Sequence, residues 1–122
     1  MSLYNKDAEQ AVLGSVLISP KTMVLLSSLL KPDDFYFEAH KIIYNSMLTV
    51  HERGEDADIV SLTEEIGENL ENAGGIVYIS ELPDIPTAAN VEQHAKIIKE
   101  KSKRRSIFEY AKKLQESVSK SD

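Results

Sequence analysis

Histidines and carboxylates are the side chains of this chain that could perform acid–base chemistry or bind a metal. The three histidines, His40, His51 and His94, lie far apart, and none has a second histidine or a cysteine at ligand spacing. Asp56 and Asp58 form a small acidic cluster, and paired carboxylates can act as acid and base when burial separates their pKa values. Because both stand in a charge-rich stretch, we expect a capping or solvated role. The sequence therefore predicts no catalytic residue and no metal site.

Nucleotide chemistry is equally absent from the pattern. Gly14 is followed by apolar residues inside a helical repeat, and no Gly-Lys-Ser or Gly-Lys-Thr triplet occurs. The chain has no cysteine, which removes disulfides, thiol catalysis and thiolate zinc sites. It also has no tryptophan, and its other aromatic residues are too scattered to form a platform for stacking bases. We expect no cofactor for this chain.

Charge is unevenly distributed along the 122 residues. Residues 1–90 hold 15 acids and 5 bases, whereas residues 91–120 hold 4 acids and 9 bases. An acidic body argues against general DNA binding, because neutralisation of phosphates drives that binding. The basic segment could contact an acidic partner, but a solvated helix face is the simpler interpretation. With no membrane-length apolar run and no export signal, we expect a cytoplasmic protein.

Apolar residues recur at helical spacing along nearly the whole chain, which predicts an all-α fold. The breaks between helices are expected at Ser19-Pro20, Lys31-Pro32, Gly54, Gly74-Gly75 and residues 83–86. The expected N-terminal caps are Asp7 with Gln10, Ser19, Asp33 or Asp34, Asp58 or Ser61, and Thr87 or Asn90. Inward stripes are expected at Ala39, Ile43, Met47 and Val50, and at Leu62, Ile66 and Leu70. Residues 76–79 favour a strand by propensity, yet a lone strand would have no partner, so we predict a short helix.

The last helix, which should run to about Val118, is the most informative element. About 28 helical residues extend about 42 Å, whereas a compact body of this length is roughly 35 Å across. Near its end, apolar residues follow a heptad-like spacing of 4, 3 and 4, at Ile107, Ala111, Leu114 and Val118. We call these four residues the seam. Residues 99–106 contain no apolar side chain and separate the seam from the core.

An exposed seam of this kind requires a neighbour. We expect Ile107, Phe108, Ala111, Leu114 and Val118 to contact a second helix, either of the same protein or of another subunit. Leaving large apolar side chains in water forgoes about 1.5 to 3 kcal/mol for each. The alternative is a frayed tail whose spacing is accidental.

A set of short strings is more specific than the helical pattern. In chain order they are DAEQAVLGSVL (residues 7–17), KPDDFY (31–36), HKII (40–43), DIVSL (58–62), the glycine pair 74–75 with Tyr78 and Glu81-Leu82, PTAANV (86–91) and AKIIKEKS (95–102). Together, in this order and at this spacing, they resemble the N-terminal domain of the bacterial replicative DNA helicase, the DnaB family. One departure is Lys103-Arg104, where the family usually has apolar residues.

The resemblance implies a compact multi-helix head over residues 1–88 and a projecting helix over residues 89–122, the first arm of a helical hairpin. The chain would be a fragment that lacks the second arm, the linker and the ATPase domain, for which ATP and Mg²⁺ are expected. In the family, six such domains form a collar above a ring that unwinds DNA in the 5′ to 3′ direction. The collar docks the C-terminal helicase-binding domain of primase and, in some bacteria, a helicase loader.

Three functional hypotheses follow. The first is a collar domain that mediates oligomerisation and primase docking, with no chemistry of its own; isolated copies would form dimers, and DNA would be contacted only by the complete ring. The second is a free-standing helical adaptor that binds helicase or primase. The third is a small helical hydrolase that uses His40 or the Asp56–Asp58 pair. A Walker motif encoded downstream would favour the first over the second.

Overall fold

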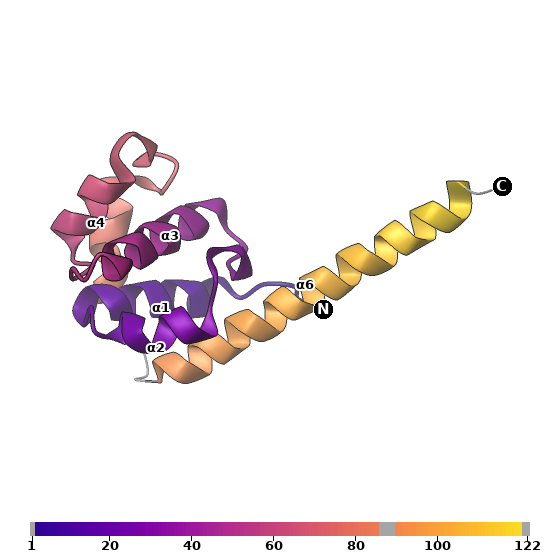
Figure 1. The fold of residues 1–122 in the computed structure, drawn as a ribbon, viewed down its shortest axis with the longest axis horizontal. Coiled ribbons are helices and arrows are strands. Elements are labelled where there is room, and N and C mark those ends of the chain that lie inside the picture. The colour runs from indigo at the N-terminus through magenta and orange to yellow at the C-terminus, as the bar shows by residue number, and fades with distance from the viewer. Residues whose placement is uncertain (1, 86–89, 121–122) are drawn as a thin grey trace.

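The fold of the computed structural model, which describes residues 2–85 and 90–120, is all-helical over those residues (Figure 1). The α-helices are α1 (Lys6–Ile18), α2 (Thr22–Leu29), α3 (Glu38–Glu52), α4 (Ile59–Ile66), α5 (Gly75–Glu81) and α6 (Val91–Lys120). Short 3-10 turns are η1 (Pro32–Asp34), η2 (Gly67–Asn69) and η3 (Leu82–Asp84). The expected all-α fold is confirmed, and the ambiguous stretch 76–79 is helical, as predicted.

Helices α1 to α5 form a head, and α6 begins against the head and then leaves it (Figure 1). The core draws on η3 and on all the helices from α1 to α6, and the first half of α6 contributes the buried Ala95 and Ile98. The stripe expected on α3 is confirmed at Ile43, Met47 and Val50, all fully buried, whereas Ala39 is only partly buried. Among the described residues, no helix combines the length and the apolarity that crossing a bilayer requires.

The predicted division into a head and an arm falls between residues 88 and 89, which is outside the described residues. The stripe expected on α4 ends early. Leu62 and Ile66 are buried, but Leu70 is only partly buried because α4 stops at Ile66 and the chain turns through η2.

The N-terminal cap of α1 is Asn5, so the prediction of Asp7 is wrong. The Asn5 side chain accepts a hydrogen bond from the Ala8 amide at 2.9 Å. Asp7 lies in the first turn, where its carboxylate still interacts favourably with the helix dipole. Gln10, the expected partner of Asp7 in a capping box, instead donates to the Tyr78 hydroxyl.

The caps expected for the next two helices are also wrong. Ser19 is the C-terminal cap of α1, and α2 begins at Thr22 with no side-chain cap. The cap position of α3 is Phe37, again without a side-chain bond, because Asp33 and Asp34 belong to the separate turn η1. Asp34 is directed toward α6 instead.

The later caps agree better with the sequence. Asp58 caps α4 and forms a reciprocal capping box with Ser61, in which each side chain accepts from the amide of the other residue. At the start of α6, the Asn90 side chain accepts from the Gln93 amide at 3.1 Å. Thr87, the other candidate cap, lies outside the described residues.

Glycines mark two of the predicted breaks and one close helix contact. Gly54 and Gly74 have φ values of 79° and 99°, in the left-handed region that favours glycine. Gly14 is different, because it lies inside α1 and a Cβ at this position would be 2.4 Å from the Leu82 carbonyl oxygen. The absence of a side chain therefore lets α1 and η3 approach each other.

Candidate protein–protein interface

The outer half of α6 projects from the head as a single helix (Figure 1). Every described residue of α6 after Arg105 is exposed to solvent. The seam side chains Ile107, Leu114 and Val118 are 68%, 50% and 71% exposed, and Phe108 is 51% exposed. The projecting helix with an exposed apolar seam is therefore present. Contact between these five predicted residues and another helix remains a prediction.

Asp34 fixes the inner half of α6 to the head. Its carboxylate accepts hydrogen bonds from the Lys99 ammonium at 2.9 Å and from the Ser102 hydroxyl at 2.7 Å. It also accepts from the Lys31 amide at 2.7 Å, which closes η1. Burial alone would raise the pKa of Asp34, but these hydrogen bonds outweigh it and lower the pKa below the usual value of 3.8. We call Asp34, Lys99 and Ser102 the clamp.

Arg105 adds a second connection where α6 leaves the head. Its guanidinium donates to the Leu3 carbonyl at 2.8 Å and to the Asp34 carbonyl at 2.7 Å. It also lies over the Tyr36 ring, 5.5 Å from the ring centre, which favours a cation–π interaction. Packing at this point is thus polar and aromatic. The charged pair 103–104 is accommodated at this point because both residues face solvent.

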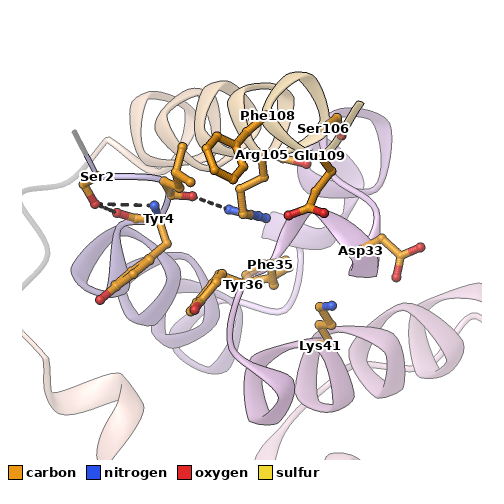
Figure 2. A pocket seen from close by; sticks show the side chains of 12 residues that line it. Ser2, Tyr4, Asp33, Phe35, Tyr36, Lys41, Arg105, Ser106, Phe108 and Glu109 are labelled. Carbon is orange, nitrogen blue, oxygen red and sulfur yellow. Dashed lines mark hydrogen bonds between the residues drawn. The ribbon is translucent and has the colours of Figure 1, made fainter. Parts of the chain in front are cut away.

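A groove of about 800 Å³ opens between the root of the projecting helix and the head (Figure 2). We call it the root groove. Its walls come from the N-terminal segment, η1, α3 and α6, and its lining includes Tyr4, Phe35, Tyr36, Lys41, Asp33, Arg105, Phe108 and Glu109. The Tyr4 and Tyr36 rings stack with their centres 4.4 Å apart. Phe108 lines this groove and also flanks the seam, so the two surfaces are continuous.

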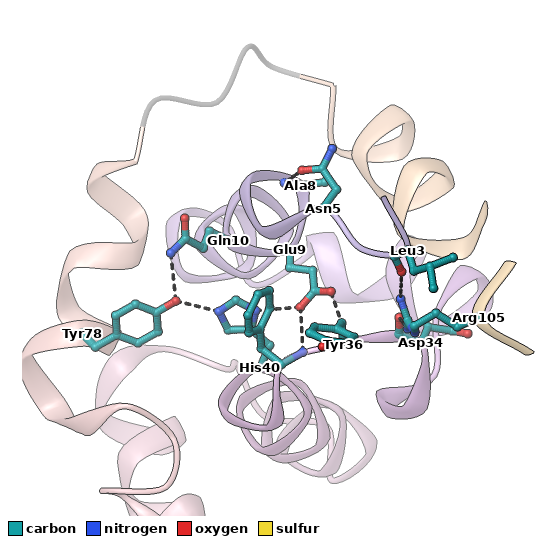
Figure 3. Close-up of polar contacts among 11 residues, drawn as sticks. Leu3, Asn5, Ala8, Glu9, Gln10, Asp34, Tyr36, His40, Tyr78 and Arg105 are labelled. Carbon is teal, nitrogen blue, oxygen red and sulfur yellow. Dashed lines mark hydrogen bonds and ion pairs between the residues drawn. The ribbon is translucent and has the colours of Figure 1, made fainter. Parts of the chain in front are cut away.

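His40 belongs to a buried hydrogen-bond chain rather than to an accessible catalytic site (Figure 3). Its Nδ1 lies 2.8 Å from the Glu9 carboxylate and its Nε2 lies 2.6 Å from the Tyr78 hydroxyl. Gln10 donates to the same hydroxyl at 3.0 Å, and Glu9 also accepts from the Tyr36 amide at 2.8 Å. The two bonds are compatible with each other when His40 Nδ1–H donates to Glu9 and Nε2 accepts from the Tyr78 hydroxyl. Glu9 and His40 are each only 1% exposed, so a substrate would not reach them.

The acidic cluster at Asp56 and Asp58 has a capping role. Hydrogen bonds from the Ser61 amide and hydroxyl lower the pKa of Asp58 below its usual value. The Asp56 carbonyl accepts from the Asp58 amide and from the Ser61 hydroxyl. Both aspartates are exposed, so the pair lacks the burial that acid–base chemistry between two carboxylates requires. Within the described ranges, no group of three or more histidines and carboxylates is placed to hold a metal ion.

Sequence reasoning missed the clamp and Arg105. The pattern around Asp34 predicts a helix cap, and residues 99–106 stand out only by their lack of apolar side chains. A signal was available, because Lys99, Ser102 and Arg105 recur at a spacing of three and share one face of a helix. Glu9 gave a similar signal, since it stands between Ala8 and Val12 on the apolar side of the first helix.

Comparisons with known proteins place this architecture among replication proteins. A family model described as the DnaB-like helicase N terminal domain matches residues 1–100. The chain is 49% identical over 108 residues to the replicative DNA helicase DnaB of Geobacillus stearothermophilus, covering 86% of this chain and 24% of that protein. It is 48% identical over 101 residues to the replicative DNA helicase DnaC of Bacillus subtilis (strain 168), covering 80% of this chain and 22% of that protein. The chain thus spans about a quarter of the length of these relatives.

Two solved structures are similar throughout the fold. One is the N-terminal domain of DnaB helicase from Mycobacterium tuberculosis, with a TM-score of 0.88, 34% identity, and coverage of 95% of this chain and 85% of that chain. The other is a DnaB-like replicative helicase described with its interactions with primase, with a TM-score of 0.83 and 31% identity. It is covered over 28% of its length by 94% of this chain.

Proposed function

The chain belongs to the DnaB-like helicase N-terminal domain family, and from this premise we propose that it is the collar domain of a hexameric replicative DNA helicase. The observation that carries the proposal is the match of residues 1–100 to that domain, together with a long exposed helix that begins in the head. In this proposal the collar performs no chemistry. An ATPase domain uses ATP and Mg²⁺ to unwind DNA, and only the complete ring contacts DNA.

The proposed work of the arm, residues 89–122, is assembly. The exposed seam supports this role, since burying each large apolar side chain against a neighbouring helix contributes about 1.5 to 3 kcal/mol. Ile107, Phe108, Ala111, Leu114 and Val118 are the residues that we assign to this interface. Copies of this chain would form dimers, and the complete protein would form hexamers.

The second proposed role of the collar domain is docking. Its partners would be the C-terminal helicase-binding domain of primase and, in some bacteria, a helicase loader. The structural relative described with its interactions with primase supports this part. Replication of a bacterial chromosome would place the protein in the cytoplasm.

A binding experiment with the cognate primase domain tests the docking role. The chain is immobilised and the C-terminal domain of primase is passed over it at up to tens of micromolar. We expect saturable binding, while the primase domain that synthesises RNA serves as a control that is not retained. Absence of binding to a chain whose circular dichroism shows a folded head would refute primase docking.

A further inference from the structure

Residues 2–5 cross the root of α6, and we call them the strap. The Ser2 carbonyl accepts a hydrogen bond from the Lys101 ammonium at 3.1 Å. The Leu3 carbonyl accepts from the Arg105 guanidinium at 2.8 Å (Figure 3). The Tyr4 ring stacks on a ring of the head and remains exposed to solvent. These hydrogen bonds hold the strap to α6 through main-chain oxygens.

Basic residues of α6 outnumber acidic ones at this point. Residues 99–113 contain seven bases and two acids, in a chain whose net charge is -6. Among the described residues, Lys101 and Arg105 form no ion pair. They donate instead to carbonyl oxygens of the strap and of η1. A carboxylate would bind either cation more strongly than a neutral carbonyl does, because both partners would then be charged.

The two cations belong to a face of α6 that is separate from the seam. Lys101 and Arg105 are four residues apart and therefore lie on one side of the helix. Phe108 and Lys112 continue that side at intervals of three and four residues. Six residues separate Lys101 from Ile107, which turns this face about 120° around the helix axis from the seam. A ligand bound to it would leave the four seam residues uncovered.

We infer that the strap covers a binding site for a short acidic segment of another protein. Two adjacent carboxylates of that segment would replace the strap carbonyls on Lys101 and Arg105. An aromatic side chain beside them would take the place of Tyr4 on the Tyr36 ring. A protein segment fits this site better than a nucleic acid, because the 15 acids and 5 bases of residues 1–90 repel a polyanion. This site is distinct from the assembly and primase-docking roles proposed above.

The strap competes with such a ligand for the same cations. It is tethered at Asn5, whose side chain caps α1, so its effective concentration at the site is high. The apparent affinity for a ligand is reduced by the fraction of molecules in which the site is covered. A change that weakens the strap should therefore strengthen binding of the acidic segment.

Fluorescence anisotropy with a labelled peptide tests the site. The peptide contains Asp-Asp-Tyr-Asn, and its control, Asn-Asn-Tyr-Asn, lacks the two carboxylates. We expect saturable binding of the acidic peptide that weakens several-fold between about 50 and about 300 mM NaCl, because salt screens exposed charges. Equal binding of the neutral peptide would overturn the inference. Displacement of the acidic peptide by an oligothymidylate of equal charge would identify a nucleic-acid site and would also overturn it.

Tyr4→Ala tests whether the strap covers the site. This variant loses the stack on Tyr36, so it should bind the acidic peptide several-fold more tightly than the unmodified chain. Tyr110→Ala is the matched control, because it removes an exposed ring from another face of α6 and should leave the affinity unchanged. If Tyr4→Ala binds no more tightly than the unmodified chain, the strap does not cover the site and the inference fails.

A double variant tests the two cations. Lys101→Gln with Arg105→Gln should weaken binding by about tenfold or more, while circular dichroism shows that the helical content is kept. Lys103→Gln with Lys113→Gln removes the same charge from exposed residues of α6 that do not line the root groove. This control should bind nearly as well as the unmodified chain. Equal losses in the two double variants would show that only the overall charge of α6 attracts the peptide, and would overturn the inference.

Discussion

At the scale of single residues, the head is joined by polar side chains that are distant in the sequence. Glu9 on α1, His40 on α3 and Tyr78 on α5 form a continuous chain of hydrogen bonds (Figure 3). Removal of one partner leaves a buried donor or acceptor unsatisfied, which costs about 1 to 3 kcal/mol. These hydrogen bonds therefore connect α1, α3 and α5 by a mechanism other than apolar packing.

Replacing Tyr78 by phenylalanine tests the importance of that chain. Tyr78→Phe keeps the ring but removes the hydroxyl that binds His40 and Gln10. We expect the free energy of unfolding in urea to fall by about 1 to 3 kcal/mol. Tyr36→Phe is the matched control, because the exposed Tyr36 ring keeps its stacking on Tyr4. Equal stability of the two variants would contradict a structural role for the buried chain.

The clamp predicts a specific dependence of stability on pH. The pKa of Asp34 is lower in the folded chain than the usual 3.8, so the folded state binds fewer protons than the unfolded state between the two values. The stabilisation is therefore complete above about pH 4 and is lost as the pH falls through the lower, folded pKa. We expect Asp34→Asn to destabilise the chain by about 1 to 3 kcal/mol near neutral pH, because its amide would face the Lys99 and Lys31 donors.

In acid, the free energy of unfolding of Asp34→Asn should differ less from that of the unmodified protein. Urea unfolding at a series of pH values should show a constant difference in unfolding free energy between the two proteins down to about pH 4. Below about pH 4 this difference should become smaller. Asp33→Asn removes the same charge from an exposed neighbour and controls for net charge. A difference that is unchanged down to pH 2 would show that the Asp34 carboxylate does not supply the stabilisation.

At the scale of elements, the close approach of α1 and η3 depends on Gly14. Alanine normally favours a helix over glycine by about 1 kcal/mol. Here its Cβ would lie 2.4 Å from the Leu82 carbonyl oxygen, a backbone atom that moves only with its whole turn. We expect Gly14→Ala to lower the melting temperature, whereas Ser28→Ala on the exposed side of α2 should not. A melting temperature that rises in Gly14→Ala would contradict the close approach of the two elements.

Helices were easier to predict than their ends. For residues 76–79 the absence of a partner strand predicted a helix against the local strand propensity, because an unpaired strand would leave backbone groups unsatisfied. The caps were less predictable, since Asn5 and Asp7 are both suitable cap residues and only the tertiary position of Gln10 separates them. Asp34 shows the same limit. A carboxylate before a helix predicts a cap, and its actual partners lie 65 and 68 residues away.

At the scale of the whole molecule, the seam should control association. Ile107→Asp with Leu114→Asp would place charges in a surface that we expect to be buried between copies, and burial of an unpaired charge is strongly unfavourable. We expect this double variant to sediment as a monomer at tens of micromolar, while the unmodified chain forms a dimer. Its helical signal should persist, because both positions lie outside the core. A monomeric unmodified chain would refute self-association.

The projection of α6 was predictable from its length, because a helix longer than the body that carries it must leave that body. The seam on it was predictable from the spacing of its apolar residues. The root groove was not predictable, since its walls come from four separate segments of the chain. Their meeting depends on the angle at which α6 crosses the head. That angle follows from contacts such as Arg105 with the Leu3 carbonyl, which no local pattern contains.

The clamp holds α6 at one point, and the helix extends freely beyond that point. The fixed point is the clamp of Asp34, Lys99 and Ser102. The 15 residues from Ser106 to Lys120 extend about 22 Å past it. If α6 tilted by about 10° relative to the head at the clamp, the end of the helix would move by about 4 Å, which is most of the rise of one helical turn. A small change in the angle between the head and α6 would thus produce a larger displacement of any group bound at the end of α6.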